Sequence, residues 1–229
     1  MKHFYRLFMG TLLFIILSGL SFGQMRIGLD TYNRYIWRGV DYGNSPSFQP
    51  SISFTTGGFS LGAWGAFSTA STFAENDLWA SYGIPTSSGT FTLYYTDYFY
   101  PSNGIKFFKY EDDGLGAHTL EAGLGYSGPE PFPVSASVYY NFFNDVDKSV
   151  YIQISYPFVI DSVYSLTVFA AGTPAKSAWY TASKSALINV GVTVTKSIKI
   201  TDEFSLPVSA SYILNPEIEQ SYLIFGISL

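Results

Sequence analysis

His118 is the one histidine that follows the N-terminal segment of the chain. A histidine can act as general base towards a serine hydroxyl if an orienting polar group lies on its other side. Ser102, Ser127 and Ser137 occur in the same part of the sequence, but no serine stands two residues from the histidine. The pattern gives little support for a lipid hydrolase. We therefore expect no catalytic residues, and we place His118 at an exposed loop end.

Acidic residues and cysteines give no pattern of metal ligands. The chain has no cysteine, which excludes disulfides, thiol catalysis and cysteine-based metal sites. Glu111, Asp112 and Asp113 form an acidic run. Such runs are usually solvated, and weak binding of a divalent cation is the alternative. We expect neither a metal nor a cofactor.

Five charged residues could form a cluster inside a barrel. In an extended strand, Asp30, Arg34 and Arg38 share one face because side chains alternate. The same rule points Asp77 and Glu121 inward from the fourth and sixth predicted strands. A Lys or Arg on a lipid-facing surface at mid-depth would cost about 2–4 kcal/mol. The cluster is either a constriction that selects solutes by charge or a set of ion pairs that closes a narrow interior.

Aromatic side chains form a second candidate site. Their rings could stack on sugar or nucleobase rings of a solute, or they could fill volume. The residues with inward parity are Trp64, Trp79, Tyr94, Tyr139, Tyr151 and Tyr222.

The elements that must position these residues are strands, because apolar and small polar residues alternate along nearly the whole chain after Gln24. The C-terminal segment is the clearest case, with Leu223, Phe225 and Ile227 on one face. About twelve such segments lie near residues 25–38, 47–56, 59–69, 75–84, 90–98, 116–127, 132–143, 148–158, 163–171, 186–196, 203–213 and 219–229. An even count of antiparallel strands is typical of bacterial outer-membrane barrels.

The connections between these segments alternate in length. Those after the second, fourth, sixth, eighth and tenth segments are mostly tight, as at Gly57-Gly58. Those at 39–46, 99–114 and 172–185 are long. Outer-membrane barrels have short periplasmic turns and longer external loops. We therefore predict an all-β, up-and-down transmembrane β-barrel of about 12 strands with both termini in the periplasm.

Composition favours a membrane barrel over a soluble one. Charged residues make up 13% of the chain, about half the share in an average soluble domain. Beyond the first two dozen residues no apolar run approaches the roughly 20 residues of a spanning helix. A soluble β-sandwich or a lipocalin-like barrel shows the same alternation with its apolar face turned inward. The small size of the polar-face residues and the aromatics near strand ends argue against that alternative.

The first residues resemble a signal peptide. Lys2 and Arg6 precede the apolar run 7–20, and small residues follow at 21–23. We predict a cleaved signal peptide at 1–23, a single barrel domain at 24–229, and export to the outer membrane. The formal net charge of −5 makes nucleic acid an improbable partner. The expected partners are outer-membrane lipid, the barrel-assembly machinery during insertion, and a small hydrophilic solute.

The run Tyr35-Ile36-Trp37-Arg38-Gly39-Val40, with Gly62-Ala63-Trp64 and Asp77-Leu78-Trp79 after it, resembles the start of the TorF family of outer-membrane porins. Later segments such as Tyr151-Ile152-Gln153 are similar too, so the resemblance covers most of the chain after residue 24. It implies a small barrel with a pore role and carries over no catalytic residues. Leu229 departs from the usual C-terminal Phe of outer-membrane barrels.

The leading hypothesis is thus a porin-like channel for passive uptake of small hydrophilic solutes, with selectivity set by charged and aromatic residues of the lumen. The alternative is a non-conducting structural or surface-binding barrel, in which the loop 99–114 binds an external partner. A more remote alternative is an outer-membrane enzyme that modifies lipids through His118.

Overall fold

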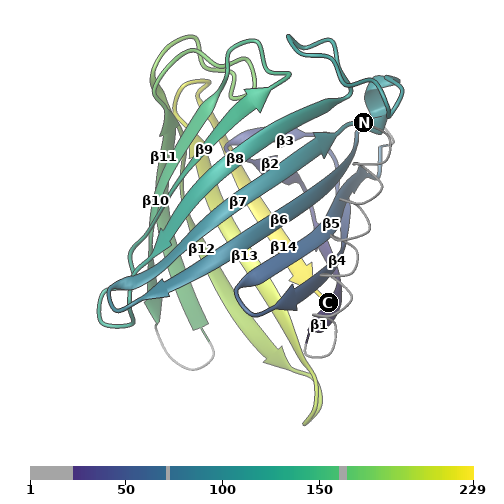
Figure 1. Ribbon diagram of the computed structural model, residues 1–229. Helices are drawn as coiled ribbons and strands as arrows, with labels where there is room; N and C mark the ends of the chain where they lie inside the picture. The colour runs from purple at the N-terminus through teal and green to yellow at the C-terminus, as the bar shows by residue number, and fades with distance from the viewer. Residues whose placement is uncertain (1–22, 71–72, 160–163) are drawn as a thin grey trace.

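The computed structural model describes residues 23–70, 73–159 and 164–229, in which twelve antiparallel strands form a closed barrel (Figure 1). The strands are β1 (Gln24–Tyr32), β4 (Ser47–Thr56), β5 (Phe59–Ser68), β6 (Ala74–Thr86), β7 (Gly89–Phe99), β8 (His118–Ser127), β9 (Ser135–Phe143), β10 (Val150–Val159), β11 (Tyr164–Thr173), β12 (Ala186–Lys199), β13 (Ser205–Asn215) and β14 (Gln220–Ser228). This confirms the predicted fold class. Of the predicted signal peptide at 1–23, residues 1–22 lie outside the described ranges.

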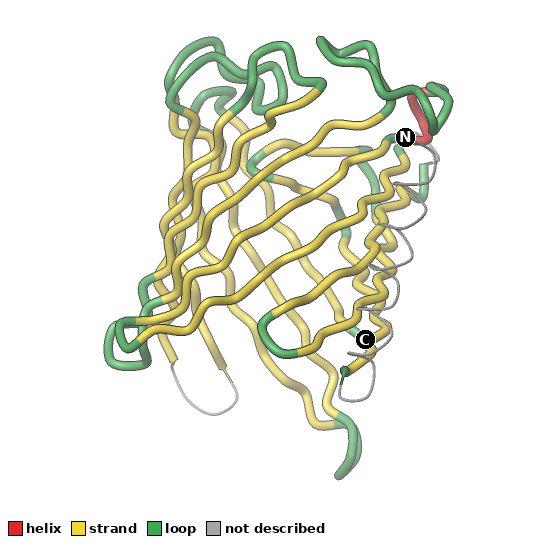
Figure 2. The backbone as a smooth tube through the Cα atoms, viewed as in Figure 1, coloured by secondary structure: helices red, strands yellow, loops and turns green. Residues whose placement is uncertain are grey.

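The connections separate the barrel into two ends, which we call the short-turn end and the long-loop end (Figure 2). The turns 57–58, 87–88, 128–134 and 200–204 lie at the short-turn end, and the segments 33–46, 100–117 and 174–185 lie at the long-loop end. The segment 100–117 contains a 3-10 helix, η2 (Pro101–Asn103). The first strand starts at the short-turn end, because Gln24 pairs with Thr55. The predicted alternation of connections is therefore present, while the side of a membrane that each end faces stays a prediction.

The outer surface of the barrel is apolar. Large apolar side chains on alternate strand positions are exposed, with Ile27 at 82%, Leu78 and Ile154 at 55%, and Phe225 at 55%. A barrel built for water would bury these side chains and expose the polar ones. A contiguous outward apolar band is what a lipid environment requires. No helix in the described ranges has both the length and the apolar character to span a membrane.

Glycines on the inner surface make room for inward aromatic rings. A Cβ added at Gly123 on β8 would lie 2.5 Å from the ring of Tyr139 on β9. One added at Gly62 would lie 2.6 Å from the ring of Trp79. Because real Cβ contacts are longer than this, the wall needs glycine wherever a ring lies flat against the neighbouring strand.

The first predicted strand is too long. Residues 25–38 were expected to be one strand, but β1 ends at Tyr32 and the chain then turns into the barrel. There β2 (Tyr35–Trp37) and β3 (Val40–Tyr42) form an inner hairpin. Its turn, Arg38-Gly39, has φ of +51° and +82°. Positive φ at both central residues is what a two-residue type I′ hairpin turn requires.

The closing seam of the barrel shows how the chain can leave the wall at this point. Strands β1 and β14 pair at three positions, the last of them Tyr32 with Gly226. Beyond the pair of Tyr32 with Gly226, the side chain of Asn33 takes the place of the β1 backbone as hydrogen-bond partner of β14. Its Nδ2 donates to the Leu223 carbonyl at 3.0 Å, and its Oδ1 accepts from the Phe225 N–H at 2.8 Å. The carboxamide thus imitates a peptide group, so that β14 keeps its hydrogen bonds while the backbone turns inward.

Candidate functional site

The tip of the inner hairpin is held by an ion pair with the wall. Arg38 Nη1 lies 2.5 Å from Glu121 Oε2 and Nη2 lies 2.9 Å from Oε1, a bidentate arrangement. The same Nη1 donates to the hydroxyl oxygen of Tyr180 at 2.7 Å. The side chains of Arg38 and Glu121 are 10% and 2% exposed. A bidentate, dehydrated contact between guanidinium and carboxylate is strong and fixes the position of both groups.

Aromatic rings surround the guanidinium. Its Cζ lies 4.4 Å from the ring centroids of Trp37 and Tyr139, 4.6 Å from that of Tyr151, and 5.8 Å from that of Tyr180. All four distances lie within the range of cation–π attraction. Arg38 therefore occupies a cage whose walls come from the hairpin, from β9 and β10, and from the segment 174–185.

Further contacts hold the hairpin close to the wall. Asn215 Nδ2 donates to the Gly39 carbonyl at 3.0 Å. A Cβ at Gly39 would lie 2.0 Å from the Ile188 carbonyl oxygen, so no other residue fits there. Tyr98 donates its hydroxyl proton to Glu121 at 3.0 Å. We call the group formed by Trp37, Arg38, Tyr98, Glu121 and Tyr180 the constriction.

The constriction separates two cavities. One, of about 320 Å³, opens among the long loops and is lined by Tyr42, Phe73, Tyr100 and Trp179. The other, of about 310 Å³, is lined by Arg38 and Glu121 and, towards the short-turn end, by wall residues that include Trp79, Ser81 and Tyr94. Between them, the ring of Trp37 contacts Tyr42, Tyr98 and Trp179 at centroid distances of 5.7–6.0 Å.

The predicted charge cluster forms only in part. Arg38 and Glu121 meet, but Arg34 forms its ion pair with Asp41 inside the hairpin. Neither arginine belongs to the barrel wall, which corrects their assignment to the first strand. Asp30 is on β1 and pairs in register with Gln49 and Ser228.

Asp77 does point inward and is 7% exposed, but it makes no ion pair within the described residues. Its Oδ1 is among the buried atoms that lack a hydrogen-bond partner there. Glu75, two residues earlier on the same face of β6, is 2% exposed and was missed, although the alternation that selected Asp77 selects it equally.

The six predicted lumen aromatics lie inside the barrel. Trp64 packs on Tyr35 of the hairpin at 5.5 Å. Tyr139 lies 5.7 Å from Tyr94 and 6.5 Å from Tyr151. Trp79 lines the cavity on the short-turn side, and Tyr222 lies near Arg34 and Asp41. Trp179 and Tyr180 were missed because they belong to a loop, where no periodic pattern indicates a direction. Whether any of these rings binds a solute stays a prediction.

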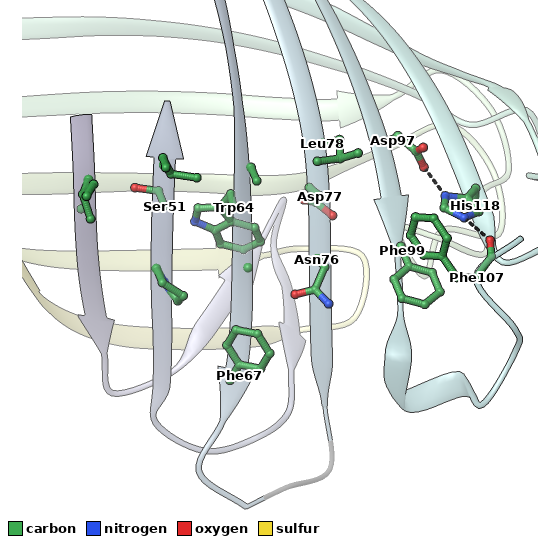
Figure 3. A pocket seen from close by; sticks show the side chains of 16 residues that line it. Ser51, Trp64, Phe67, Asn76, Asp77, Leu78, Asp97, Phe99, Phe107 and His118 are labelled. Carbon is green, nitrogen blue, oxygen red and sulfur yellow. Dashed lines mark hydrogen bonds and ion pairs between the residues drawn. The ribbon is translucent and has the colours of Figure 1, made fainter. Parts of the chain in front are cut away.

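His118 corrects another expectation. It is 1% exposed rather than an exposed loop end, and it lies on the outer face of the wall under the segment 100–117. Its Nδ1 lies 2.7 Å from Asp97 Oδ1 and its Nε2 lies 2.6 Å from the Phe107 carbonyl oxygen (Figure 3). The ring of Tyr110 stacks on it at 4.1 Å. Both ring nitrogens are engaged, so neither is free to activate a serine.

Ion pairs join the long loops to one another. Lys148 Nζ lies 3.0 Å from Asp112 Oδ1, and Lys176 Nζ lies 3.1 Å from Asp147 Oδ1. The backbone N–H of Asp113 and then Lys148 lower the pKa of Asp112. The backbone N–H of Ala178 and then Lys176 lower the pKa of Asp147. In the part of the chain that the structure describes, no group of three or more His, Asp or Glu side chains is arranged to hold a metal ion.

The chain was compared with family models, curated proteins and solved structures. No family model matches the chain, and no curated protein matches it. Among solved structures, a Pseudomonas aeruginosa FadL homologue is similar, with 10% sequence identity and a TM-score of 0.44 over 90% of this chain and 74% of the other. The resemblance to the TorF family stays a prediction from the sequence.

Proposed function

We propose that the protein is a porin-like channel of the outer membrane for small hydrophilic solutes, and that the inner hairpin is its gate. The outward apolar band supports insertion in a bilayer. The contact of Arg38 with Glu121, between two cavities, carries the proposal of a gate. In this proposal, a solute that crosses the barrel passes this contact.

The chemistry of the constriction suits a gate better than a permanent core. Its contacts are an ion pair, hydrogen bonds and aromatic edges, all of which water can replace when the hairpin moves. The hairpin strands have three residues each, and hairpins of that size have little stability of their own. The hairpin therefore depends on the constriction for its position.

Planar-bilayer conductance of the purified, refolded protein tests the proposal. The wild-type barrel is expected to carry small or intermittent current, and Arg38→Ala a larger and sustained one. Arg34→Ala is the matched control, because Arg34 forms its ion pair with Asp41 of the hairpin and not with Glu121 of the wall. Absence of current from both the wild type and Arg38→Ala would overturn the proposal.

The second candidate function is a non-conducting barrel with a structural or surface-binding role. It is favoured by how completely the long-loop half is filled, since Asn141, Tyr180 and Ile188 are 0% exposed. In that case the segment 99–114 binds the external partner. Its deletion would abolish surface binding and leave the barrel folded, whereas Arg38→Ala would still carry no current.

We further propose that the protein has no enzymatic activity, and that the outer membrane is reached through a signal peptide at 1–23 and the barrel-assembly machinery. A lipid-modifying enzyme would require a free histidine nitrogen next to a nucleophile. His118→Ala is therefore expected to leave the lipid composition of the host membrane unchanged. A changed composition would favour the enzyme hypothesis over the other two.

A further inference from the structure

The wall of the long-loop half carries three buried acidic side chains. Glu75 and Asp77 on β6 and Glu121 on β8 are 2%, 7% and 2% exposed, and they lie close enough to interact electrostatically. Glu121 pairs with Arg38 of the hairpin, while Arg34 is paired with Asp41. When the hairpin leaves the site, Glu121 loses its cationic partner and faces the lumen with two further acidic side chains beside it.

The aromatic cage remains on the wall as well. Tyr139 and Tyr151 belong to β9 and β10, so they do not move with the hairpin. Their ring centroids lie 4.4 and 4.6 Å from the Arg38 Cζ, where ring faces attract a weakly hydrated cation. A guanidinium or an alkylammonium group fits this chemistry better than a small, strongly hydrated metal ion.

Unpaired acceptors point to the same kind of ligand. Among the described residues, the buried side-chain atoms without a hydrogen-bond partner include two amide oxygens, Asn141 Oδ1 and Asn189 Oδ1. Asn189 lies beside the hairpin turn, since its Cβ is 3.3 Å from the Cβ position of Gly39. Its Nδ2 donates to the Tyr151 hydroxyl at 2.8 Å, which leaves only its oxygen unpaired. Buried acceptors without donors favour a ligand rich in N–H groups.

We propose that Glu121, Tyr139 and Tyr151 form a binding site for a small organic cation with a guanidinium or alkylammonium group, and that Arg38 is its tethered occupant in the closed barrel. The inference rests on the proposed function, because a solute can enter only when the hairpin leaves. It adds the chemical class of the solute. A tethered group competes at a local concentration in the millimolar range, so free cations bind the wild type weakly.

Removal of the tethered occupant tests the site. Arg38→Ala, refolded in detergent, is titrated with methylguanidinium and followed by calorimetry. The same compound is then added during bilayer recording. We expect binding at least about tenfold tighter than to the wild type, and a current that methylguanidinium blocks. Urea, which has a similar shape and no charge, and acetate, which has the opposite charge, are expected to do neither.

Two further variants separate the site from its surroundings. In the double variant Arg38→Ala/Glu121→Gln, the glutamine keeps the shape of the Glu121 side chain and removes its charge. It is expected to bind methylguanidinium roughly tenfold more weakly than Arg38→Ala, as loss of a desolvated charge partner implies. Arg34→Ala leaves the cage occupied and is expected to bind like the wild type. If Arg38→Ala does not fold, Arg38→Gln is used in its place in every experiment, because it preserves a hydrogen bond to Glu121 and removes the cation.

The outcomes distinguish the two proposals. A conducting Arg38→Ala channel that neither binds methylguanidinium nor is blocked by it would overturn the cation site and leave the channel standing. Binding without any current would support the cation site and overturn the channel. Equal binding of methylguanidinium and urea would also contradict the site, because its selectivity depends on charge.

Discussion

Tyr94 and Tyr98 lie four residues apart on the same inward face of β7, and their exposure to solvent differs strongly. Tyr94 is 36% exposed and faces the cavity on the short-turn side, whereas Tyr98 is 5% exposed within the constriction. The short-turn half is lined by uncharged polar residues such as Ser137, Gln153 and Thr193. The long-loop half contains the hairpin. Strand parity therefore decides which way a side chain points, while the inserted hairpin decides whether it meets water.

This difference has a consequence for stability. In the long-loop half, charged groups are dehydrated and depend on one another, so the loss of one partner leaves the other with no solvent. In the short-turn half, water in the lumen can replace a hydrogen-bond partner that a substitution removes. Similar substitutions in the two halves should therefore change the free energy of unfolding by unequal amounts.

The largest effect is expected at the constriction. Glu121→Ala leaves the Arg38 guanidinium buried without its carboxylate, and loss of one partner of a buried pair typically costs about 3–5 kcal/mol. Ser137→Ala on the neighbouring strand, in the short-turn half, should change the free energy of unfolding by less than about 0.5 kcal/mol. Urea titration of the two refolded variants measures both values, and equal losses would contradict the distinction between the halves.

The next largest effect is expected from a charge placed on the outer face of the barrel, compared with the same charge on the inner face. Ile154 points outward and is 55% exposed, whereas Gln153 points into the lumen. Ile154→Arg should lower the free energy of unfolding in lipid vesicles by about 2–4 kcal/mol, because it puts a charge in the bilayer. Gln153→Arg should have a clearly smaller effect. The reverse order would mean that the outward face does not contact lipid.

A smaller effect is expected where glycine makes room for a ring. A Cβ at Gly123 would lie 2.5 Å from Tyr139, which is held against Arg38. Gly123→Ala should cost about 1–3 kcal/mol through overpacking. A Cβ at Gly125 would lie 2.9 Å from the ring of Tyr94, which is more exposed and free to move, so Gly125→Ala should cost less. A larger loss for Gly125→Ala would show that the short-turn half is packed as tightly as the other.

The smallest effect concerns pH at the long loops. The pKa values of Asp112 and Asp147 lie below their usual 3.8, so both carboxylates stabilise the folded loops above that pH. The stabilisation is lost as the pH falls through the lowered pKa values. Protection of the amides of Asp113, Asn144 and Ala178 against hydrogen exchange should therefore fall below about pH 4, relative to protection in the barrel strands. Unchanged protection of these loop amides in acid would contradict the assignment.

Much of this architecture could be predicted from the sequence, because alternation and turn residues are local signals. The inward direction of Asp77, Glu121 and Tyr94 follows from strand parity alone. The inner hairpin does not, since residues 35–37 continue the pattern of β1, and only partners far along the chain, such as Glu121 and Tyr180, make the inward path favourable. The burial of His118 was missed for the same reason, because it depends on how the segment 100–117 folds back on the wall.

Thiol labelling tests the division of the lumen most directly, because the chain contains no cysteine. Ser137→Cys places a thiol in the short-turn half, and Ser47→Cys places one at an inward position of β4 that is 1% exposed. A water-soluble thiol reagent should modify the first thiol rapidly and the second very slowly. Adding Arg38→Ala to Ser47→Cys should accelerate the slow reaction. Equal rates at the two positions in the presence of Arg38 would contradict a lumen that the hairpin closes.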